Sequence, residues 1–554
     1  MEFNLARVFS AVAEAVPDRD CIVFGDRRLS FGQVQGRSQR LARALHEHGL
    51  GVRRERGELA PDESGQSHLA LYLANGNEYL EGMLGAYNAR VAPFNVNYRY
   101  VADELVYLLT NAAAEAIMYH ARYAPTLAEA LQQAGDRLAE PMLIHVDDDS
   151  GHPPLPGAVR YEELLATTSA EPLDLALSPD DLYLLYTGGT TGMPKGVMWR
   201  QHDIYINAMG GRAFGTGAVP TDMAEIVDRA RAGGAGSMTV APLMHGAAQW
   251  AAFITLLGGR PFVMSTATDR FDPVATWELA AKERVISLSI VGDAFARPLA
   301  DALEAGGPEL AEDLSGLFVL ASGGAALTVP VKQRILDLLP QLSILDAGGS
   351  SETGAQMGQT TSKDQPSTGR FTPNPGAVVV SEDMSRILTP GDDEIGWLAQ
   401  QGYVPLGYLG DPEKSARTFP VIEGVRHSVP GDRARWDADG GIELLGRDSV
   451  TINSGGEKIF AEEVEAAIAQ HPAVYDVVVV GRPSERWGNE VVAVVQLAEG
   501  AQADSADIVA EAAHHIARYK LPKDVVFCPQ VQRSPSGKAD YRWAKAQAVA
   551  AQQA

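Results

Sequence analysis

One stretch of the sequence, residues 187–195, carries side chains suited to holding a chain of phosphates. It reads TGGTTGMPK and combines three glycines, three threonines and a lysine. Glycine lets the backbone come close to an anion, threonine hydroxyls donate hydrogen bonds, and lysine adds a positive charge. The candidate residues are Thr187, Gly188, Gly189, Thr190, Thr191, Gly192 and Lys195. The apolar run at residues 182–185 directly before them predicts a strand that leads into a polyphosphate-binding loop.

The position of Lys195 separates this loop from the loop of kinases and motor ATPases. Their motif ends in Gly-Lys-Ser or Gly-Lys-Thr, which sets the lysine beside a magnesium-binding hydroxyl. Here Lys195 lies between Pro194 and Gly196, so that class of nucleotide hydrolase is disfavoured. A surface turn rich in glycine and threonine is the alternative interpretation, and motifs farther along the chain argue against it.

Four more motifs follow at large separations. They are SGGAAL from Ser322, GGSSETG from Gly348, PGDRARWDADGGIELLGR from Pro430 and RSPSGKADYRWAK from Arg533. Each alone could be a turn, but in this order they closely resemble the adenylate-forming superfamily of acyl-CoA synthetases, peptide adenylation domains and luciferases. The resemblance covers nearly the whole chain. Stretches such as FNVNYRYVADEL and INSGGEKIFAEEVE are most similar to actinobacterial CoA ligases for fatty acids and for steroid or other terpenoid acids.

The chemistry of that superfamily explains the residue types. A carboxylate does not accept a thiol directly, so it is first joined to AMP with release of pyrophosphate, and the thiol then displaces AMP. The first step brings two anions together, which requires cations and oriented donors that bind the transition state more strongly than the ground state. The resemblance therefore implies ATP or a preformed acyl-AMP, Mg²⁺ and coenzyme A as the small molecules involved.

The resemblance also assigns roles to single residues. Lys538 would reach the carboxylate and the α-phosphate, acting by its charge, while Thr190 and Lys195 bind phosphate. Glu352, together with Thr190, would hold Mg²⁺, because this hard cation prefers oxygen ligands. His245 would form a gate between the nucleotide and the acyl group. An ordinary surface lysine, a surface glutamate and a packed core histidine are the respective alternatives.

Further residues are assigned to the nucleotide, the acid and CoA. Asp432 would accept the ribose hydroxyls, and Arg447 would reach the ribose or phosphate; an ordinary salt bridge is the alternative for both. Nucleotide-site candidates also include Gly323, Gly324, Ala325, Gly348, Gly349, Ser350 and Ser351, the acyl pocket has His245, Gly246, Asp293 and Ser322, and the CoA and hinge region has Asp448, Ser449, Gly455 and Gly456. Small residues in the acyl region leave room for a bulky acid.

One position departs from the superfamily pattern. Many members have an aromatic residue that stacks on adenine where this chain has Gly348. Stacking of a base on an aromatic ring contributes roughly 1–3 kcal/mol, so ATP binding would weaken by about tenfold or more. One hypothesis is that adenylation is weak while thioester formation persists. The other is that a neighbouring side chain covers the base and both steps proceed.

The elements that position these residues follow from the hydrophobic pattern. Short apolar runs alternate with helical patterns between residues 69 and 345, which predicts a layered α/β fold with mainly parallel strands. We expect a large N-terminal domain over residues 1–446 and a small mobile α+β domain over residues 447–554. The small domain would rotate between the two half-reactions. The N-terminus is an amphipathic helix, and residues 51–67 are an exposed loop with no assigned chemistry.

Composition narrows the class of partner. The formal net charge of −25 disfavours nucleic acid. Cys21 and Cys528 are too few to form a disulfide framework, and no apolar stretch reaches the ~20 residues that span a bilayer. A cytoplasmic enzyme without integral membrane association fits best. Its oligomeric state stays open, and a homodimer is possible.

These observations lead to one function and three alternatives. The leading hypothesis is an acyl-CoA ligase that acts on a long-chain or polycyclic terpenoid or steroid-like acid through an acyl-adenylate. The alternatives are a ligase that mainly thioesterifies a preformed acyl-adenylate, a ligase that loads a carrier protein, and a non-catalytic adenylate-binding protein. The last would bind tightly without turnover, and the presence of Lys195, Glu352, Asp432 and Lys538 argues against it.

Overall fold

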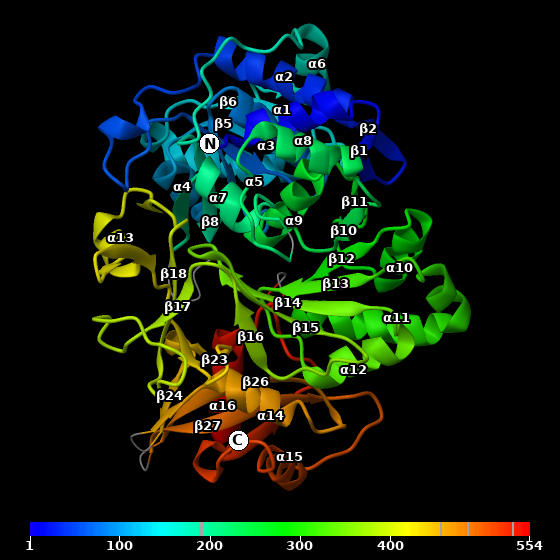
Figure 1. The fold of residues 1–554 in the computed structure, drawn as a ribbon, viewed down its shortest axis with the longest axis vertical. Helices are drawn as coiled ribbons and strands as arrows, with labels where there is room; N and C mark the ends of the chain where they lie inside the picture. Colours follow the sequence, from blue (N-terminus) through cyan, green and yellow to red (C-terminus); the bar gives the residue numbers. More distant parts are fainter. Residues whose placement is uncertain (188–192, 214, 455–456, 485–486, 535–536, 554) are drawn as a thin grey trace. The chain divides into compact units, whose positions relative to one another are not determined.

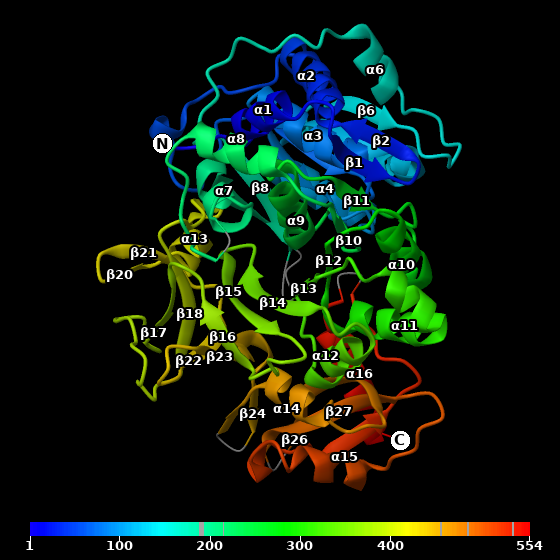
Figure 2. The same ribbon diagram turned by 45° about the vertical axis from the view of Figure 1, so that its right-hand side comes forward.

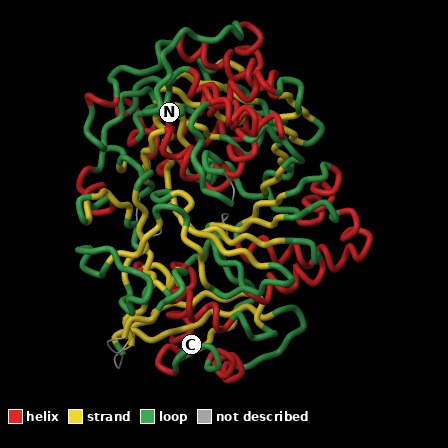
Figure 3. Tube along the Cα trace, in the orientation of Figure 1, coloured by secondary structure: helices red, strands yellow, loops and turns green. Residues whose placement is uncertain are grey.

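The computed structural model describes residues 1–187, 193–213, 215–454, 457–484, 487–534 and 537–553. Its backbone contacts divide the chain into two compact units, and neither is one continuous stretch. The first unit contains residues 1–289, 350–355 and 402–420, and the second contains residues 290–349, 356–401 and 421–554. Both units mix helices and strands, as Figures 1 and 3 show. The α/β class predicted from the sequence is confirmed.

An eight-stranded sheet organises the first unit, in the order β19-β9-β8-β4-β3-β5-β6-β7. The strands from β8 to β7 run parallel, whereas β9 and β19 are antiparallel additions at one edge. The bounds are β3 His68–Tyr72, β4 Ala92–Asn95, β5 Ala114–His120, β6 Met142–Val146, β7 Val159–Arg160, β8 Leu182–Thr187, β9 Lys195–Arg200 and β19 Gly407–Tyr408. The strand predicted at residues 182–185 is therefore β8.

Further strands of the first unit are β1 Asp20–Phe24, β2 Arg27–Ser30, β10 Ser237–Thr239, β11 Phe262–Met264 and β12 Ser287–Ile290. Its helices are α1 Leu5–Ala15, α2 Phe31–Glu47, α3 Asn77–Asn88, α4 Ala102–Asn111, α5 Ala124–Ala134, α6 Tyr161–Thr167, α7 Gln201–Ala208, α8 Met223–Ala232, α9 Gly246–Leu257, α10 Pro273–Lys282 and α13 Pro412–Thr418. The predicted N-terminal helix is confirmed as α1. Asn4 caps it by accepting a hydrogen bond from the backbone N–H of Arg7.

The core of this unit lies on both sides of the sheet strands. Every residue of α3 is buried, and side chains of α4 and α5 share an apolar core with those of β3, β4, β5 and β8. Residues 51–67 form a segment with little regular structure, as predicted, apart from a single 3-10 turn at Arg56–Glu58. Its end is not exposed, because Gly65 and Ser67 are buried next to β3.

The second unit contains β13 Val319–Gly323, β14 Ser343–Ser350, β15 Gly354–Thr361, β16 Arg370–Pro373, β17 Ala377–Val380, β18 Gly396–Gln401, β20 Val421–Ile422, β21 Val425–Ser428, β22 Asp432–Trp436 and β23 Ile442–Arg447. β13 and β14 are parallel, while the pairings from β15 to β20 are antiparallel. The turn between β14 and β15, residues 350–355, clusters with the first unit. Two helices, α11 Gly292–Asp313 and α12 Val329–Leu338, lie beside β13 and β14 (Figure 2).

The C-terminal part of the second unit has its own sheet and core. Its strands are β24 Ile452–Ser454, β25 Glu457–Ile459, β26 Val474–Ser484, β27 Gly488–Leu497 and β28 Asp524–Phe527, and its helices are α14 Ala461–Ile468, α15 Ser505–Ala512 and α16 Tyr541–Gln553. Valines of β26 and β27 supply much of the core. The predicted domain boundary between residues 446 and 447 stays a prediction.

One helix of this part is shorter than the sequence pattern predicts. The run ADIVAEAAHHIARY indicates a helix through residue 519, but α15 ends at Ala512. After it, His514 and His515 donate their N–H groups three residues back, to the carbonyls of Glu511 and Ala512, which tightens the chain into a turn. Histidine has a weaker helix propensity than alanine, so two in succession favour this ending. In the part of the chain that the structure describes, no helix is long and apolar enough to cross a membrane.

Candidate active site

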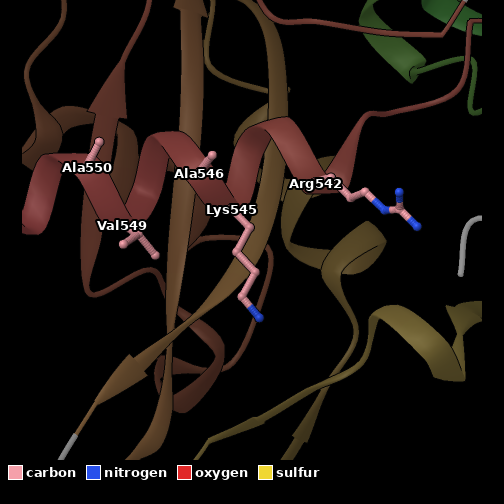
Figure 4. Close-up of a pocket in the computed structure, with 5 residues that line it drawn as sticks. All are labelled: Arg542, Lys545, Ala546, Val549 and Ala550. Carbon is pink, nitrogen blue, oxygen red and sulfur yellow. The ribbon is translucent and has the colours of Figure 1, made fainter.

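The candidate residues are shared between the two units. The first unit holds Thr187, Lys195, His245, Gly246, Ser350, Ser351 and Glu352, and the second holds Asp293, Ser322, Gly323, Gly324, Ala325, Gly348, Gly349, Asp432, Arg447, Asp448, Ser449 and Lys538. Gly188, Gly189, Thr190, Thr191, Gly192, Gly455 and Gly456 lie outside the described residues. A shallow surface pocket on α16, drawn in Figure 4, is lined by none of the candidates.

The predicted phosphate loop connects the two strands of a hairpin. β8 and β9 pair in antiparallel fashion, and their last facing residues are Thr187 and Lys195. Residues 182–186 are buried, which anchors the hairpin in the sheet while both of these facing side chains stay half-buried at its end. The loop therefore begins and ends on rigid backbone, and Lys195 is part of a strand instead of a mobile turn.

Asn95, at the end of β4, fastens this hairpin to the segment before His245. Its side chain accepts a hydrogen bond from the N–H of Tyr186 at 2.7 Å and donates to the carbonyl oxygen of Tyr186 at 2.8 Å. The same amide donates to the carbonyl oxygen of Met244 at 2.7 Å. A buried amide with these backbone partners positions two chain segments at once. Sequence reasoning gave Asn95 no role, although a polar residue directly after a buried strand was the available signal.

Lys195 lies among the side chains of a distant segment. β19 pairs with β9, with Tyr408 facing Val197, so residues 407–414 run beside the hairpin. The Lys195 ammonium is 5.5 Å from the centre of the Tyr408 ring and 3.8 Å from a carboxylate oxygen of Asp411. Partial burial, followed by the neighbouring ammonium of Lys414, lowers the pKa of Lys195 from 10.5 to about 8.

Glu352 meets the same tyrosine from the turn between β14 and β15. Its carboxylate accepts a hydrogen bond from the Tyr408 hydroxyl at 2.9 Å. The turn is held in place because the indole N–H of Trp199 donates to the carbonyl oxygen of Ser351 at 2.9 Å. Gly354 closes the turn with a φ of +67°, and a Cβ there would collide with the side chain of Asn207. The structure thus brings Glu352 and Lys195 together at Tyr408.

The donor set around Glu352 fits a magnesium ion that arrives with a nucleotide. Among the described residues, no three His, Cys, Asp or Glu side chains gather in a cluster that could hold a metal by themselves. Mg²⁺ is ordinarily held by one or two carboxylates together with substrate phosphates and water. A single glutamate near Lys195, the lysine predicted to bind phosphate, is consistent with that mode of binding.

His245 and Gly246 begin helix α9. Gly246 is buried, and a Cβ at this position would lie 2.7 Å from a methyl carbon of Leu185 in β8. Only glycine therefore lets the first turn of α9 approach the hairpin of β8 and β9, the phosphate hairpin, this closely. His245, one residue earlier, is half-buried and belongs to the segment that Asn95 holds.

In the second unit, Asp293 and Ser322 fix the start of α11. The Asp293 carboxylate accepts hydrogen bonds from the N–H and the hydroxyl of Thr328, each at 2.8 Å, and from Arg297 at 2.7 Å. The N–H of Gly292 donates to the Ser322 hydroxyl at 3.0 Å. These bonds hold the segment from Ser322 to Thr328, which includes Gly323, Gly324 and Ala325, against the helix.

Gly348 leaves space that a buried methionine fills. A Cβ on Gly348 would lie 2.6 Å from Cε and 2.8 Å from Cγ of Met357, both shorter than real side chains tolerate. Met357 is 2% exposed and packs with apolar side chains of the neighbouring strands. Met357 therefore fills the space that a side chain at position 348 would take.

Asp432 and Arg447 face each other across β22 and β23. Nε of Arg447 donates to a carboxylate oxygen of Asp432 at 3.1 Å, and the backbone N–H of Arg447 donates to Glu462 at 3.4 Å. Burial is the main cause that raises the pKa of Glu462. Asp448 and Ser449 follow in a 3-10 turn, Asp448–Val450.

Lys538 is exposed at the end of a tight turn. Its carbonyl oxygen accepts the N–H of Ser534 at 2.7 Å, and its own N–H donates to the Ser534 hydroxyl at 3.2 Å. Arg533 makes two hydrogen bonds to the carboxylate of Asp476, at 2.8 and 2.7 Å, and a third to the carbonyl oxygen of Gly537 at 3.2 Å. A half-buried ion pair between Arg533 and Asp476 of β26 therefore supports the backbone next to Lys538.

The turn that carries Lys538 packs near the start of α11, within the same unit. Gly537 has a φ of +75°, and a Cβ there would be 2.8 Å from the carbonyl oxygen of Val291. Its next nearest neighbour would be the methyl group of Ala294, at 3.4 Å. The structure therefore brings the backbone beside Lys538 close to residues 291–294, a segment that includes the acyl-pocket candidate Asp293.

The comparisons with known proteins all match this chain to one family. The sequence matches the AMP-binding enzyme family over residues 9–409 and the AMP-binding enzyme C-terminal domain over residues 463–538. It is 55% identical to the medium-chain acyl-CoA ligase Mig of Mycobacterium avium, over 99% of this chain and 98% of that one. It is 38% identical to the 3-oxocholest-4-en-26-oate–CoA ligase of Rhodococcus rhodochrous, over 99% of this chain and 96% of that one.

Solved structures show the same fold. The anthranilate CoA ligase AuaEII in complex with anthranoyl-AMP aligns with a TM-score of 0.82 at 20% identity, covering 100% of this chain and 98% of that one. ATP-bound MatB from Rhodopseudomonas palustris aligns with a TM-score of 0.78 at 23% identity, covering 99% of both chains. The chain therefore belongs to the AMP-binding enzyme family of the adenylate-forming superfamily, and it is an AMP-forming acid–thiol ligase.

Proposed function

We propose that this enzyme joins a bulky hydrophobic carboxylic acid to coenzyme A through an acyl-adenylate. The observation that carries the proposal is the meeting of Lys195 and Glu352 at Tyr408, at the end of the β8–β9 hairpin. A cation and a magnesium-type carboxylate beside a glycine- and threonine-rich loop are the groups that a nucleoside triphosphate requires.

The first half-reaction forms the adenylate. A carboxylate oxygen attacks the α-phosphorus of ATP, and the bond from that phosphorus to the bridging oxygen of pyrophosphate breaks. Lys195 and Thr190 neutralise and orient the phosphates, and Lys538 stabilises the charge at the reacting carboxylate and α-phosphate. Glu352 and Thr190 would hold Mg²⁺, which would supply charge neutralisation at the phosphate oxygens. In the second half-reaction the CoA thiol attacks the acyl carbon, and AMP leaves.

Further candidate residues would bind the ribose, the base and the phosphates of the nucleotide. Asp432 accepts the ribose hydroxyls, and its contact with Arg447 orients that carboxylate. Residues Gly323, Gly324 and Ala325 together with Gly348, Gly349, Ser350 and Ser351 would surround the base and phosphates. Met357 occupies the space beside Gly348, and we propose that both half-reactions proceed without an aromatic side chain at this position.

The acid class is proposed from the acyl-pocket candidates and the relatives. His245, Gly246, Asp293 and Ser322 would line the acyl pocket, where small residues leave space for a large apolar group. A relative at 55% identity is named for medium-chain acids, one at 38% for a steroid acid, and one at 39% for both fatty acids and that steroid acid, which supports a hydrophobic acid. The CoA and hinge assignments for Asp448, Ser449, Gly455 and Gly456, the cytoplasmic location and the homodimer stay predictions.

A panel of medium-chain, long-chain, steroid and diterpenoid acids tests the proposal. Each acid is incubated with ATP, Mg²⁺ and CoA, and AMP and the acyl-CoA are measured separately by mass spectrometry. We expect equal amounts of both products with one acid class. Thioester only from a synthetic adenylate would favour the enzyme that uses a preformed adenylate, and product only on a carrier protein would favour the carrier ligase. Tight adenylate binding without any product would refute catalysis.

A further inference from the structure

The segment beside the phosphate hairpin places a second lysine next to Lys195. β19 is fixed to β9 by its pairing and by a hydrogen bond from the N–H of Leu409 to the carbonyl oxygen of Gly196 at 2.8 Å. Helix α13 follows at once, and Asp411 caps it by accepting the N–H of Lys414 at 3.0 Å. The Ser415 hydroxyl accepts the N–H of Tyr408 at 2.8 Å, which holds the helix against the strand. The position of Lys414 is therefore set by the fold.

The two lysine ammonium groups share one aromatic ring. Nζ of Lys195 lies 5.5 Å from the centre of the Tyr408 ring, and Nζ of Lys414 lies 5.4 Å from it. Aromatic rings attract cations within about 6 Å, but two like charges at one ring repel each other. Asp411 has an oxygen 3.8 Å from Nζ of Lys195, and Glu352 accepts a hydrogen bond from the Tyr408 hydroxyl. Two ammonium groups held this close to one ring are suited to binding an anion of high charge.

We propose that Lys414 and Lys195 together bind pyrophosphate, the leaving group of adenylation, with Tyr408 as the platform between them. This inference rests on the proposed function and deepens it. Pyrophosphate carries more negative charge than one Mg²⁺ neutralises, and lysine binds phosphate as a compact point charge. The Tyr408 hydroxyl also bonds to Glu352. Both cations and the magnesium-type carboxylate are thus linked through one side chain.

The lowered pKa of Lys195 follows from the same arrangement and makes the site testable by pH. Burial and then Lys414 lower this pKa to about 8, while Asp411 opposes and Arg417 of α13 adds to the effect. Tyr408 of β19, and Tyr107 of α4, which donates to the carbonyl oxygen of Pro194 at 3.2 Å, also border Lys195. Pyrophosphate favours the protonated amine, so its affinity should fall as the pH rises through about 8. Removing Lys414 should move that fall to higher pH.

Pyrophosphate titration of the full-length enzyme tests the inference. Binding of pyrophosphate in the presence of Mg²⁺, without acid or CoA, is measured by isothermal titration calorimetry between pH 6.5 and 9.5. We expect Lys414→Met to weaken binding at pH 7 by about tenfold to hundredfold, the range of a lost charge-assisted contact. Lys414→Arg should restore most of the affinity. Lys282→Met, which removes an exposed lysine of α10, is the matched control and should bind as the unchanged enzyme does.

Thioester formation separates a binding role from a structural one. Synthetic acyl-adenylate already lacks pyrophosphate, so Lys414→Met should convert it to acyl-CoA at the rate of the unchanged enzyme. Unchanged pyrophosphate affinity in Lys414→Met, a loss without a shift of the pH profile, or an equal loss of thioester formation would each overturn the inference. If the unchanged enzyme makes no acyl-CoA from any acid yet binds pyrophosphate through Lys414, the proposed function fails and the anion site stands.

Discussion

The contact between Gly348 and Met357 predicts a strong thermodynamic coupling between the two positions. Gly348→Ala adds a carbon that would lie 2.6 and 2.8 Å from two atoms of Met357. Overpacking of this kind costs about 1–3 kcal/mol. Met357→Ala empties part of a buried cluster and costs about 2–5 kcal/mol. It also removes both of the atoms that the new carbon at position 348 would meet.

The double variant should therefore be more stable than the sum of the single variants predicts. Because Met357→Ala removes the whole collision, the cost of Gly348→Ala should nearly vanish in that background, which gives a coupling of about 1–3 kcal/mol. Urea unfolding followed by tryptophan fluorescence measures this coupling. Hydrogen exchange of residues 343–361 checks that the effect of the substitutions is local to this region. An equal cost of Gly348→Ala with and without Met357 would show that the methionine does not fill this space.

The same variants distinguish the two hypotheses about adenine. If Met357 covers the base, Met357→Ala should raise the ATP concentration needed for half-maximal pyrophosphate exchange, and Gly348→Phe in the Met357→Ala background should lower it again. Stacking of the base on the added ring contributes roughly 1–3 kcal/mol, equivalent to about tenfold in affinity per 1.4 kcal/mol. A double variant with no gain for ATP, together with weak exchange in the unchanged enzyme, would favour impaired adenylation.

Three further variants test how the site is positioned. Arg533→Gln removes the support of the backbone beside Lys538, so pyrophosphate exchange should fall about tenfold or more while thioester formation from synthetic adenylate is spared. Arg533→Lys should recover part of the exchange, and an equal loss in both assays would indicate general unfolding. Asn95→Ala leaves backbone groups of the phosphate hairpin and of the segment before His245 without their partner. We therefore expect a loss of about 2–5 kcal/mol in the free energy of unfolding and a higher KM for the acid. An unchanged melting temperature would contradict this expectation. Glu465 is buried, and desolvation followed by Glu462 raises its pKa from 4.5 to about 8. Since the folded form then binds a proton that the unfolded form releases, the contribution of Glu465 to stability is lost as pH rises from 4.5 through about 8. Glu465→Gln should therefore gain stability relative to the unchanged enzyme at pH 9 but not at pH 5.

Local sequence patterns predicted the elements that carry the site, and they failed where the site depends on distant pairing. The apolar run before the phosphate loop is β8, and the amphipathic pattern at the N-terminus is helix α1. These succeed because burial imposes a period on neighbouring residues. Tyr408 and Lys414 had no such signal. They reach Lys195 only because β19 pairs with a strand about two hundred residues earlier in the chain.

The match between Gly348 and Met357 was beyond reach for a related reason. From the sequence, glycine at this position indicates only that a side chain is missing. The compensating side chain comes from the next strand, and its direction depends on packing in the cluster that includes Val379 and Leu398. A missing aromatic residue therefore does not by itself predict a weakened site, because volume lost at one position can be supplied from another.

The charge of the whole chain explains why several cations are gathered at the phosphate hairpin. With 46 basic and 71 acidic residues, the net charge of −25 produces a potential that repels ATP, pyrophosphate and CoA. Burial and Lys414 together lower the pKa of Lys195 to about 8, so the pair loses part of its charge under mildly alkaline conditions. A second lysine on the same aromatic ring raises the local positive charge, at the cost of repulsion in the empty site. That repulsion between the two ammonium groups is relieved only when the phosphates are bound, so the site binds an anion of high charge more strongly than one of low charge. Release of pyrophosphate restores the repulsion, and deprotonation of Lys195 then reduces it.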